Sequence, residues 1–233
     1  MPTCHSTNDV AADLYKKNKI KAGDIVIAAE QTAGRGQRGN KWESAPGKNL
    51  TCSFFFQPSF LEPSNSFFLS IFSSLGIYDY LSRFDDRFRI KWPNDIFFEN
   101  KKICGILIEN AVRGSNIHSS ILGMGLNVNQ TAFKTPGAIS LTQIVEKEFD
   151  LAGVLEEIAQ SLEKRYFQLE RGEFDKLKKN YLKKLYWINE EHTFYDIAFF
   201  KGRIVGISEN GRLQIRKESG LTEYDFKEVR FIR

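Results

Sequence analysis

The hydrophobic pattern of the chain changes near residues 186–190, and this change most constrains the fold. Before it, stretches with apolar residues three and four positions apart, typical of helices, alternate with short aromatic and branched runs, typical of strands. After it, short alternating runs are separated by Lys-Gly, Asn-Gly and Ser-Gly pairs, which favour tight turns. The pattern predicts an α+β domain over residues 1–186, followed by a small all-β domain, a barrel or sandwich, over residues 187–233.

Four helices are predicted in the first domain. One begins near Asn8, a largely buried one covers residues 65–84, a third begins at residue 151 with Asp150 as its cap, and a shorter one covers residues 173–185. Runs of branched and aromatic residues predict strands between them. These strands are expected at residues 24–31, 49–58, 87–93, 95–99, 102–109 and 119–129.

Composition excludes several classes of protein. With 42% hydrophobic and 27% charged residues, the chain of 233 residues has the balance of a globular protein and not of a disordered one. Its three cysteines are widely separated, which suggests neither a disulfide framework nor a metal knuckle. No stretch approaches 18 apolar residues, and the start of the chain does not resemble a signal peptide. We therefore expect a cytoplasmic protein without a membrane segment.

A long loop rich in glycine and cationic residues is predicted over residues 32–48. Within it, residues 34–39 read GRGQRG, so that backbone N–H groups can approach an anion closely while guanidinium groups supply charge. This pattern indicates a site for phosphate or carboxylate. Taken alone, the loop could instead be a flexible connection or an RNA contact. The loop lacks the Gly-Lys-Ser/Thr ending of a P-loop.

A second candidate is the pentapeptide KWPND at residues 91–95. Here a strand delivers Lys91, a proline ends the ladder, and an amide and a carboxylate follow at the turn. A half-buried lysine is costly unless an anion meets it, which favours a ligand site. A strand end whose turn is stabilised by Asn94 and Asp95 explains the pentapeptide equally well.

Five motifs in order make the chain similar to biotin protein ligases. They are STN at residues 6–8, QTAGRGQRGNKW at 31–42, KWPND at 91–95, KICGILIE at 102–109 and GMGLNVN at 123–129. The resemblance is strong over residues 6 to about 130, looser to about residue 185, and extends into a tail similar to the SH3-like domain of that family. It implies a two-step reaction in which biotin and ATP form biotinyl-5′-adenylate and a lysine of a carrier protein then takes the biotinyl group.

The resemblance also implies roles for individual residues. Lys91 and Arg35 are the expected catalytic residues, with Lys91 touching both the biotin carboxylate and the α-phosphate. Biotin is expected to contact Ser6, Thr7, Asn8, Gln31, Gly34, Arg35, Gly36, Gln37, Lys91 and Gly105. ATP is expected to contact Arg35, Gly36, Arg38, Gly39, Trp42, Lys91, Asn94 and Asn127. Asp95 is expected either to bind Mg²⁺ or to accept the proton of the target lysine.

For the whole molecule, the resemblance implies a class II synthetase-like catalytic core with a mixed β-sheet flanked by helices, and a C-terminal SH3-like β-barrel. The expected acceptor is the biotin carboxyl carrier protein of an acyl-CoA carboxylase, and homodimers occur in the family. Only five residues precede Ser6, so a DNA-binding domain and a specific DNA partner are not expected. A lipoate or octanoate ligase or transferase of the same superfold is the alternative enzyme, and an independent peptide-binding domain is the alternative for the tail.

The chain departs from the family pattern in the glycine-rich loop. Many members have arginine where this chain has Gln37, and often a basic residue where it has Asn40. Less charge is therefore available to hold phosphate. We predict weaker retention of the adenylate, and no change in the reaction.

Overall fold

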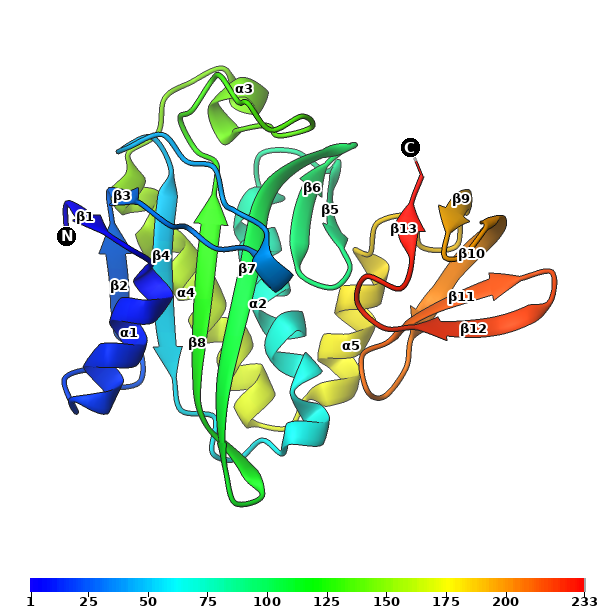
Figure 1. Cartoon of the computed structure of the whole chain (residues 1–233), viewed down its shortest axis with the longest axis horizontal. Coiled ribbons are helices and arrows are strands. Elements are labelled where there is room, and N and C mark those ends of the chain that lie inside the picture. The colour runs from blue at the N-terminus through cyan, green and yellow to red at the C-terminus, as the bar shows by residue number, and fades with distance from the viewer. Residues whose placement is uncertain (233) are drawn as a thin grey trace.

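A computed structural model describes residues 1–232, apart from the side chain of Arg38. The centre of the protein is a six-stranded sheet in the order β2-β4-β8-β7-β6-β5 (Figure 1). Every neighbouring pair in this sheet is antiparallel. The expected mixed sheet requires parallel as well as antiparallel pairs. Among the named strands of residues 1–232, only β1 and β3 pair in parallel. The strands span Thr3–Cys4 (β1), Ile25–Ala28 (β2), Glu30–Gln31 (β3), Leu50–Phe56 (β4), Phe88–Lys91 (β5), Asp95–Phe98 (β6), Lys101–Arg113 (β7) and Asn116–Leu126 (β8).

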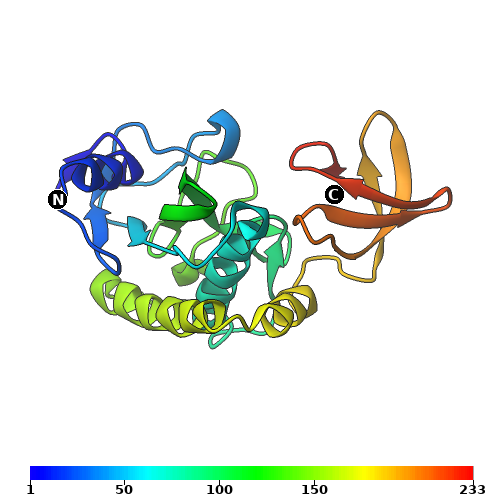
Figure 2. The same cartoon turned by 90° about the horizontal axis from the view of Figure 1, so that it is seen from below.

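Helices cover both faces of this sheet. The helix α1 lies on one face, and α2, α4 and α5 lie on the other (Figure 2). All four predicted helices are present, and the Asp150 carboxylate caps α4 by accepting from the N–H groups of Ala152 and Gly153. The short α3 was not predicted, although Ser140 and Gln143 form a capping box at its start. The helices span Thr7–Lys16 (α1), Phe67–Leu81 (α2), Leu141–Val145 (α3), Leu151–Glu170 (α4) and Phe174–Lys183 (α5), with single 3₁₀ turns at Gln37–Gly39 and Pro63–Asn65.

Strand β4 shows why the sheet needs cover on both sides, because all seven of its residues are buried. Alternate side chains point to opposite faces of a strand. Phe54 and Phe56 join the large core beneath α2 and α4, whereas Phe55 packs in a smaller cluster against α1. The same alternation in β7 and β8 decides which residues face α1 and which face the core.

The C-terminal region forms a separate five-stranded sheet in the order β12-β11-β10-β9-β13. Its strands span Glu191–Tyr195 (β9), Phe199–Ile207 (β10), Leu213–Lys217 (β11), Gly220–Tyr224 (β12) and Arg230–Phe231 (β13). The small β domain was predicted, and it fits an SH3-like fold, but β12 and β13 are not paired within residues 1–232, so this sheet does not close into a barrel. The turn predicted at Lys201-Gly202 is wrong. Gly202 lies inside β10, where an added Cβ would come 2.7 Å from Cγ2 of Ile215 on β11.

The two sheets share one core. Phe194, Ile204 and Ile215 of the C-terminal sheet belong to the same buried cluster as the core beneath α2. In addition, the Trp92 indole Nε1 donates to the Gly211 carbonyl at 2.9 Å. A boundary near residue 187 stays a prediction, because packing is continuous across it. None of the helices described in residues 1–232 has both the length and the apolar character to cross a bilayer.

Candidate active site

A pocket opens on the face of the sheet that α1 covers, and its floor consists of glycines. In the parts of β7 and β8 beneath the pocket, Cys104, Ile106, Leu122, Met124 and Leu126 belong to the core, so the alternate residues Gly105, Gly123 and Gly125 face the pocket. An added Cβ at Gly123 would come 2.4 Å from Oδ1 of Asn8, and one at Gly125 would come 2.3 Å from Cε2 of Trp42. The missing side chains are therefore what leaves room above the sheet.

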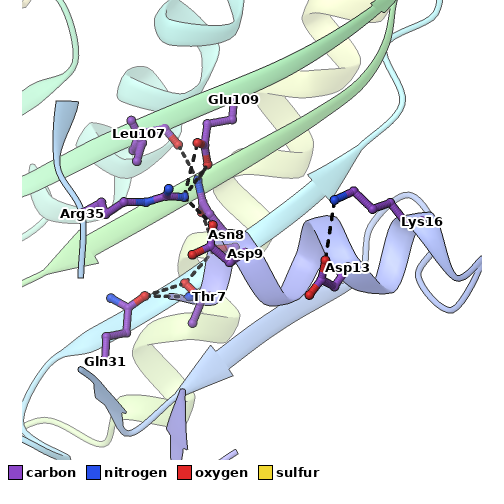
Figure 3. A network of polar contacts seen from close by, with 10 residues as sticks. Thr7, Asn8, Asp9, Asp13, Lys16, Gln31, Arg35, Leu107 and Glu109 are labelled. Carbon is purple, nitrogen blue, oxygen red and sulfur yellow. Dashed lines mark hydrogen bonds and ion pairs between the residues drawn. The ribbon is translucent and has the colours of Figure 1, made fainter. Parts of the chain in front are cut away.

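The start of α1 forms one polar wall. Ser6, Thr7 and Asn8 are each about 97% buried, since 3% of each is exposed, and they line the pocket together with Gln31. The Gln31 side-chain oxygen accepts from the Thr7 backbone N–H at 2.8 Å and from the Thr7 hydroxyl at 3.1 Å (Figure 3). Ser53 Oγ lies 2.8 Å from Thr7 Oγ1 and 2.6 Å from Asn8 Oδ1. This network fixes the polar groups before any ligand binds.

Arg35 closes the same wall from the glycine-rich loop. Its Nη2 donates to Oδ1 of Asp9 at 2.6 Å and lies 3.4 Å from both carboxylate oxygens of Glu109 (Figure 3). Glu109 in turn accepts from the Asn8 amide at 2.6 Å. The predicted group of Ser6, Thr7, Asn8, Gln31 and Arg35 is thus brought together.

Lys102 is the cation that reaches the pocket floor, and the sequence reasoning gave it no role. Its ammonium lies 2.8 Å from the Asp95 carboxylate, and both residues line the pocket beside Gly105. The register shifts between Ile96 and Phe97 of β6, so that Ile103 is an extra residue in β7. Strict alternation from Gly105 would turn residue 102 toward the core, and the bulge turns it toward the pocket instead.

Lys91 is not placed in the pocket, so its expected position is corrected. It lies directly opposite Asp95 in the register of the β5–β6 hairpin, but it belongs to β5, the edge strand of the sheet. Its ammonium lies 5.0 Å from the ring centre of Phe97 and 4.8 Å from that of Phe231. Lys91 is absent from the described residues that line the pocket, whereas Lys102 is present.

The loop over residues 32–48 forms the roof. Gly36, Gln37 and Trp42 line the pocket, and the Trp42 ring centre lies 5.6 Å from the Lys102 ammonium. The Trp42 Nε1 is buried, with no hydrogen-bond partner in the part of the chain that the structure describes. A buried donor without a partner is costly, so this indole is suited to meeting an acceptor on a ligand.

The remaining predicted residues are only partly brought to the site. Asn94 lines the pocket, and its side-chain amide donates to the Ile106 carbonyl. Gly34, Gly39 and Asn127 are not among the described lining residues; the Asn127 amide donates to the Ile139 carbonyl at 3.0 Å and anchors the segment before α3. The predicted role of the Arg38 side chain lies outside the described residues. Phe226 of the C-terminal region lines the pocket and was not predicted.

The pocket residues do not build a metal site of their own. Asp95 is a single carboxylate already paired with Lys102, and residues 1–232 contain no cluster of three potential metal-binding side chains. Mg²⁺ is usually held by one or two carboxylates together with substrate phosphates, so we assign no step to the ion. A thiol nucleophile is also disfavoured, because burial raises the pKa of Cys52, at the pocket, to about 12.

Comparison with known proteins places the chain in a family. Residues 1–127, more than half of the chain, match the model of the Biotin/lipoate A/B protein ligase family. The chain belongs to this family. Among its members, the Bifunctional ligase/repressor BirA of Bacillus subtilis is 30% identical over 225 residues, which cover 93% of this chain and 68% of that protein. The Biotin--[acetyl-CoA-carboxylase] ligase of Paracoccus denitrificans is 34% identical over 108 residues, covering 44% and 43% of the two chains.

A solved structure of the same family extends the likeness to the whole fold. The biotin protein ligase from Aquifex aeolicus, in complex with biotin and ATP, aligns with a TM-score of 0.83 at 28% identity. The alignment covers 100% of this chain and 97% of that one. Both sheets are thus part of the architecture shared with that biotin ligase.

Proposed function

We propose that the protein is an ATP-dependent biotin protein ligase. In the first step a biotin carboxylate oxygen attacks the α-phosphorus of ATP, the bond to the β-phosphate oxygen breaks, and pyrophosphate leaves. In the second step a lysine amine of an acceptor protein attacks the acyl carbon, loses a proton, and releases AMP. The observation that carries the proposal is the convergence of Arg35, Lys102 and a buried polar wall over one glycine floor.

The two cations answer the electrostatic demand of adenylation. Biotin carboxylate and ATP repel each other, and negative charge grows on the phosphoryl oxygens in the transition state. The Lys102 ammonium stands over the floor and is oriented by Asp95, so we assign it the role expected of Lys91: contact with the biotin carboxylate and the α-phosphate. A compact ammonium can bridge two oxygens without requiring a planar arrangement. Arg35 stands at the wall formed by the start of α1, where it contacts Asp9, and would hold the carboxylate and later the acyl phosphate.

The polar wall favours biotin over lipoate. The ureido ring of biotin carries two N–H donors and a carbonyl acceptor, whereas the lipoyl ring carries no such groups. Thr7 and Asn8 provide a buried hydroxyl and a buried amide at one end of the pocket, and the half-buried Gln31 amide lies beside them. A purely apolar ring would displace water from these groups without replacing its hydrogen bonds. Lipoate or octanoate ligation is the second candidate, because the description of the family names lipoate as well as biotin.

The acceptor protein, the metal ion and the cellular location are proposed from the chemistry of the family. We propose the biotin carboxyl carrier protein of an acyl-CoA carboxylase as the acceptor, MgATP as the form of the nucleotide, and the cytoplasm as the location. Pairing of core sheets into a homodimer is proposed as well, and sedimentation at several concentrations tests it.

Intact-mass measurement tests the function directly. The protein is incubated with MgATP, a carrier domain, and either biotin or lipoate. We expect the carrier to gain the mass of one biotinyl group, and no mass with lipoate. Transfer of lipoate alone would overturn the assignment in favour of the second candidate, and transfer of neither would reject ligation.

A further inference from the structure

Glu43 connects the roof of the pocket to a segment 91 residues later in the chain. Glu43 directly follows Trp42 in the chain, and its carboxylate accepts three hydrogen bonds. The donors are the Lys134 backbone N–H at 2.8 Å, the Thr135 backbone N–H at 2.7 Å and the Thr135 hydroxyl at 2.6 Å. Both carboxylate oxygens are used, so the carboxylate holds residues 134–135 in one orientation.

The segment that Glu43 holds continues directly to Lys102. The Lys102 N–H donates to the Gly137 carbonyl at 2.7 Å, and the Ile139 N–H donates to the Lys102 carbonyl at 3.0 Å. Residues 134–139 therefore form a short brace. One end is attached to the residue after Trp42, and the other is attached to the backbone of the lysine on the pocket floor.

We propose that Glu43 is a positioning residue that holds the Trp42 roof and the Lys102 strand together around the adenylate, an inference that rests on the proposed ligase function. Glu43 itself is not among the described residues lining the pocket. Its effect on the ligand is therefore indirect. It determines how far the roof can move from the floor, and so how readily a bound adenylate escapes.

The contacts around Glu43 are suited to this role. Hydrogen bonds from the Thr135 hydroxyl and from backbone N–H groups hold the pKa of Glu43 below its usual range, so the carboxylate is charged at neutral pH. Separate contacts fix the base of the loop, because Gln130 Oε1 accepts from the Ala45 N–H at 2.8 Å and from the Asn49 amide at 2.6 Å. Removing the Glu43 carboxylate should thus loosen the roof without unfolding the loop.

Release of the adenylate is the first test. After one turnover with labelled biotin and MgATP, the dissociation rate of biotinyl-adenylate is measured for wild type, Glu43→Gln and Thr135→Val. We expect Glu43→Gln to speed release by about tenfold, because the NH₂ group of the new glutamine would face a backbone N–H donor. We expect Thr135→Val to speed release less, because only the hydrogen bond from the hydroxyl is lost. Release of biotin without ATP should change less, since the wall at residues 6–8 is untouched.

Two matched variants serve as controls. Thr135→Ser keeps the hydroxyl. Glu148→Gln removes a carboxylate that also holds the loop, through a pair with Lys48 at 3.4 Å, but neither partner is in residues 134–139 or lines the pocket. Both should release the adenylate at the wild-type rate. If Glu43→Gln releases it no faster than Glu148→Gln, or if it speeds release of biotin and adenylate equally while lowering the melting temperature, the positioning role is rejected.

Trypsin provides a readout that needs no ligand. Lys41 and Lys134 are exposed. Lys41 lies two residues before Glu43, and Lys134 belongs to the contact itself, so cleavage after each reports opening of its own loop. We expect Thr135→Val to speed cleavage after Lys41, and Glu43→Gln to speed cleavage after both. Cleavage that changes only in the loop carrying the substitution would overturn the inference. If wild type forms no biotinyl-adenylate, ligation is rejected, and proteolysis still decides whether Glu43 joins the loops.

Discussion

The identity of the pocket lysine is the main question at the scale of single residues. Lys102 and Lys91 both lie on the face of the sheet that carries the pocket, yet only the Lys102 ammonium reaches the floor, while that of Lys91 lies over two aromatic rings. Arginine and lysine near a forming anhydride contribute by charge, which is effective only at short distance. The assignment therefore depends on where each ammonium stands, and not on which motif contains it.

We predict that Lys102→Ala lowers kcat/KM for adenylate formation by about a hundredfold or more, because the charge that stabilises the phosphoryl oxygens is lost. Lys91→Ala should lower it by no more than about threefold. Pyrophosphate release with biotin and MgATP measures both, and thermal unfolding of each variant controls for loss of folded protein. A larger loss in Lys91→Ala would restore the assignment expected from the sequence.

Gln37 bears on how long the intermediate is held. It lines the pocket in the glycine-rich loop, at the position where the resemblance to the family led us to expect arginine. Gln37→Arg should slow dissociation of biotinyl-adenylate by about tenfold, since a guanidinium forms charge-assisted hydrogen bonds to the phosphoryl group that an amide cannot. Single-turnover trapping measures the rate, with Gln37→Lys as a comparison for charge alone. An unchanged dissociation rate in both variants would show that residue 37 does not contact the phosphate.

At the scale of elements, the glycine floor of β7 and β8 is the most demanding feature. We predict that Gly125→Ala weakens biotin and ATP binding by about tenfold, because the new methyl group would displace Trp42. Alanine suits a strand at least as well as glycine, so the melting temperature should not fall. Calorimetric titration and thermal unfolding test the two halves of this prediction. Normal binding in Gly125→Ala would show that the Trp42 ring moves away from the floor without consequence.

Helices, most strands and the polar wall could be predicted from the sequence, because periodicity, caps and motifs are local signals. Features set by contacts between strands could not. Gly202 was expected in a turn but lies within β10, where Ile215 approaches closely. Lys102 depends on a bulge that arises only when β6 and β7 pair. Phe226 reaches the pocket from the turn between β12 and β13, which no spacing along the chain indicates.

At the scale of the whole molecule, the common core makes the two sheets one folding unit. Phe194 and Ile204 are fully buried in the same cluster as Phe72, so removing residues from about 188 onward would expose apolar surface of the first domain. Loss of ligation by such a truncation would therefore not separate a role in catalysis from a role in stability.

We predict a single cooperative unfolding transition in urea. The far-UV circular dichroism, which reports both sheets, and the tryptophan fluorescence, to which Trp92 and Trp187 at the junction contribute, should change at the same denaturant concentration. Two transitions, with the fluorescence changing first, would show that the C-terminal sheet unfolds on its own and would support the boundary near residue 187.

The extra residue in β7 has a consequence for how this enzyme can vary. Ile103 sets the side to which Lys102 turns. The side on which the Lys102 ammonium stands therefore depends on the number of residues between the β6–β7 turn and the glycine floor. Exchange of Ile103 for another branched residue preserves that count. Deletion of Ile103 would remove the bulge and leave Lys102 opposite Phe97, on the pocket side. A one-codon insertion after Lys102, with the bulge kept, would turn Lys102 to the other side, so sequence libraries of this enzyme should show substitutions at this point but no added residue.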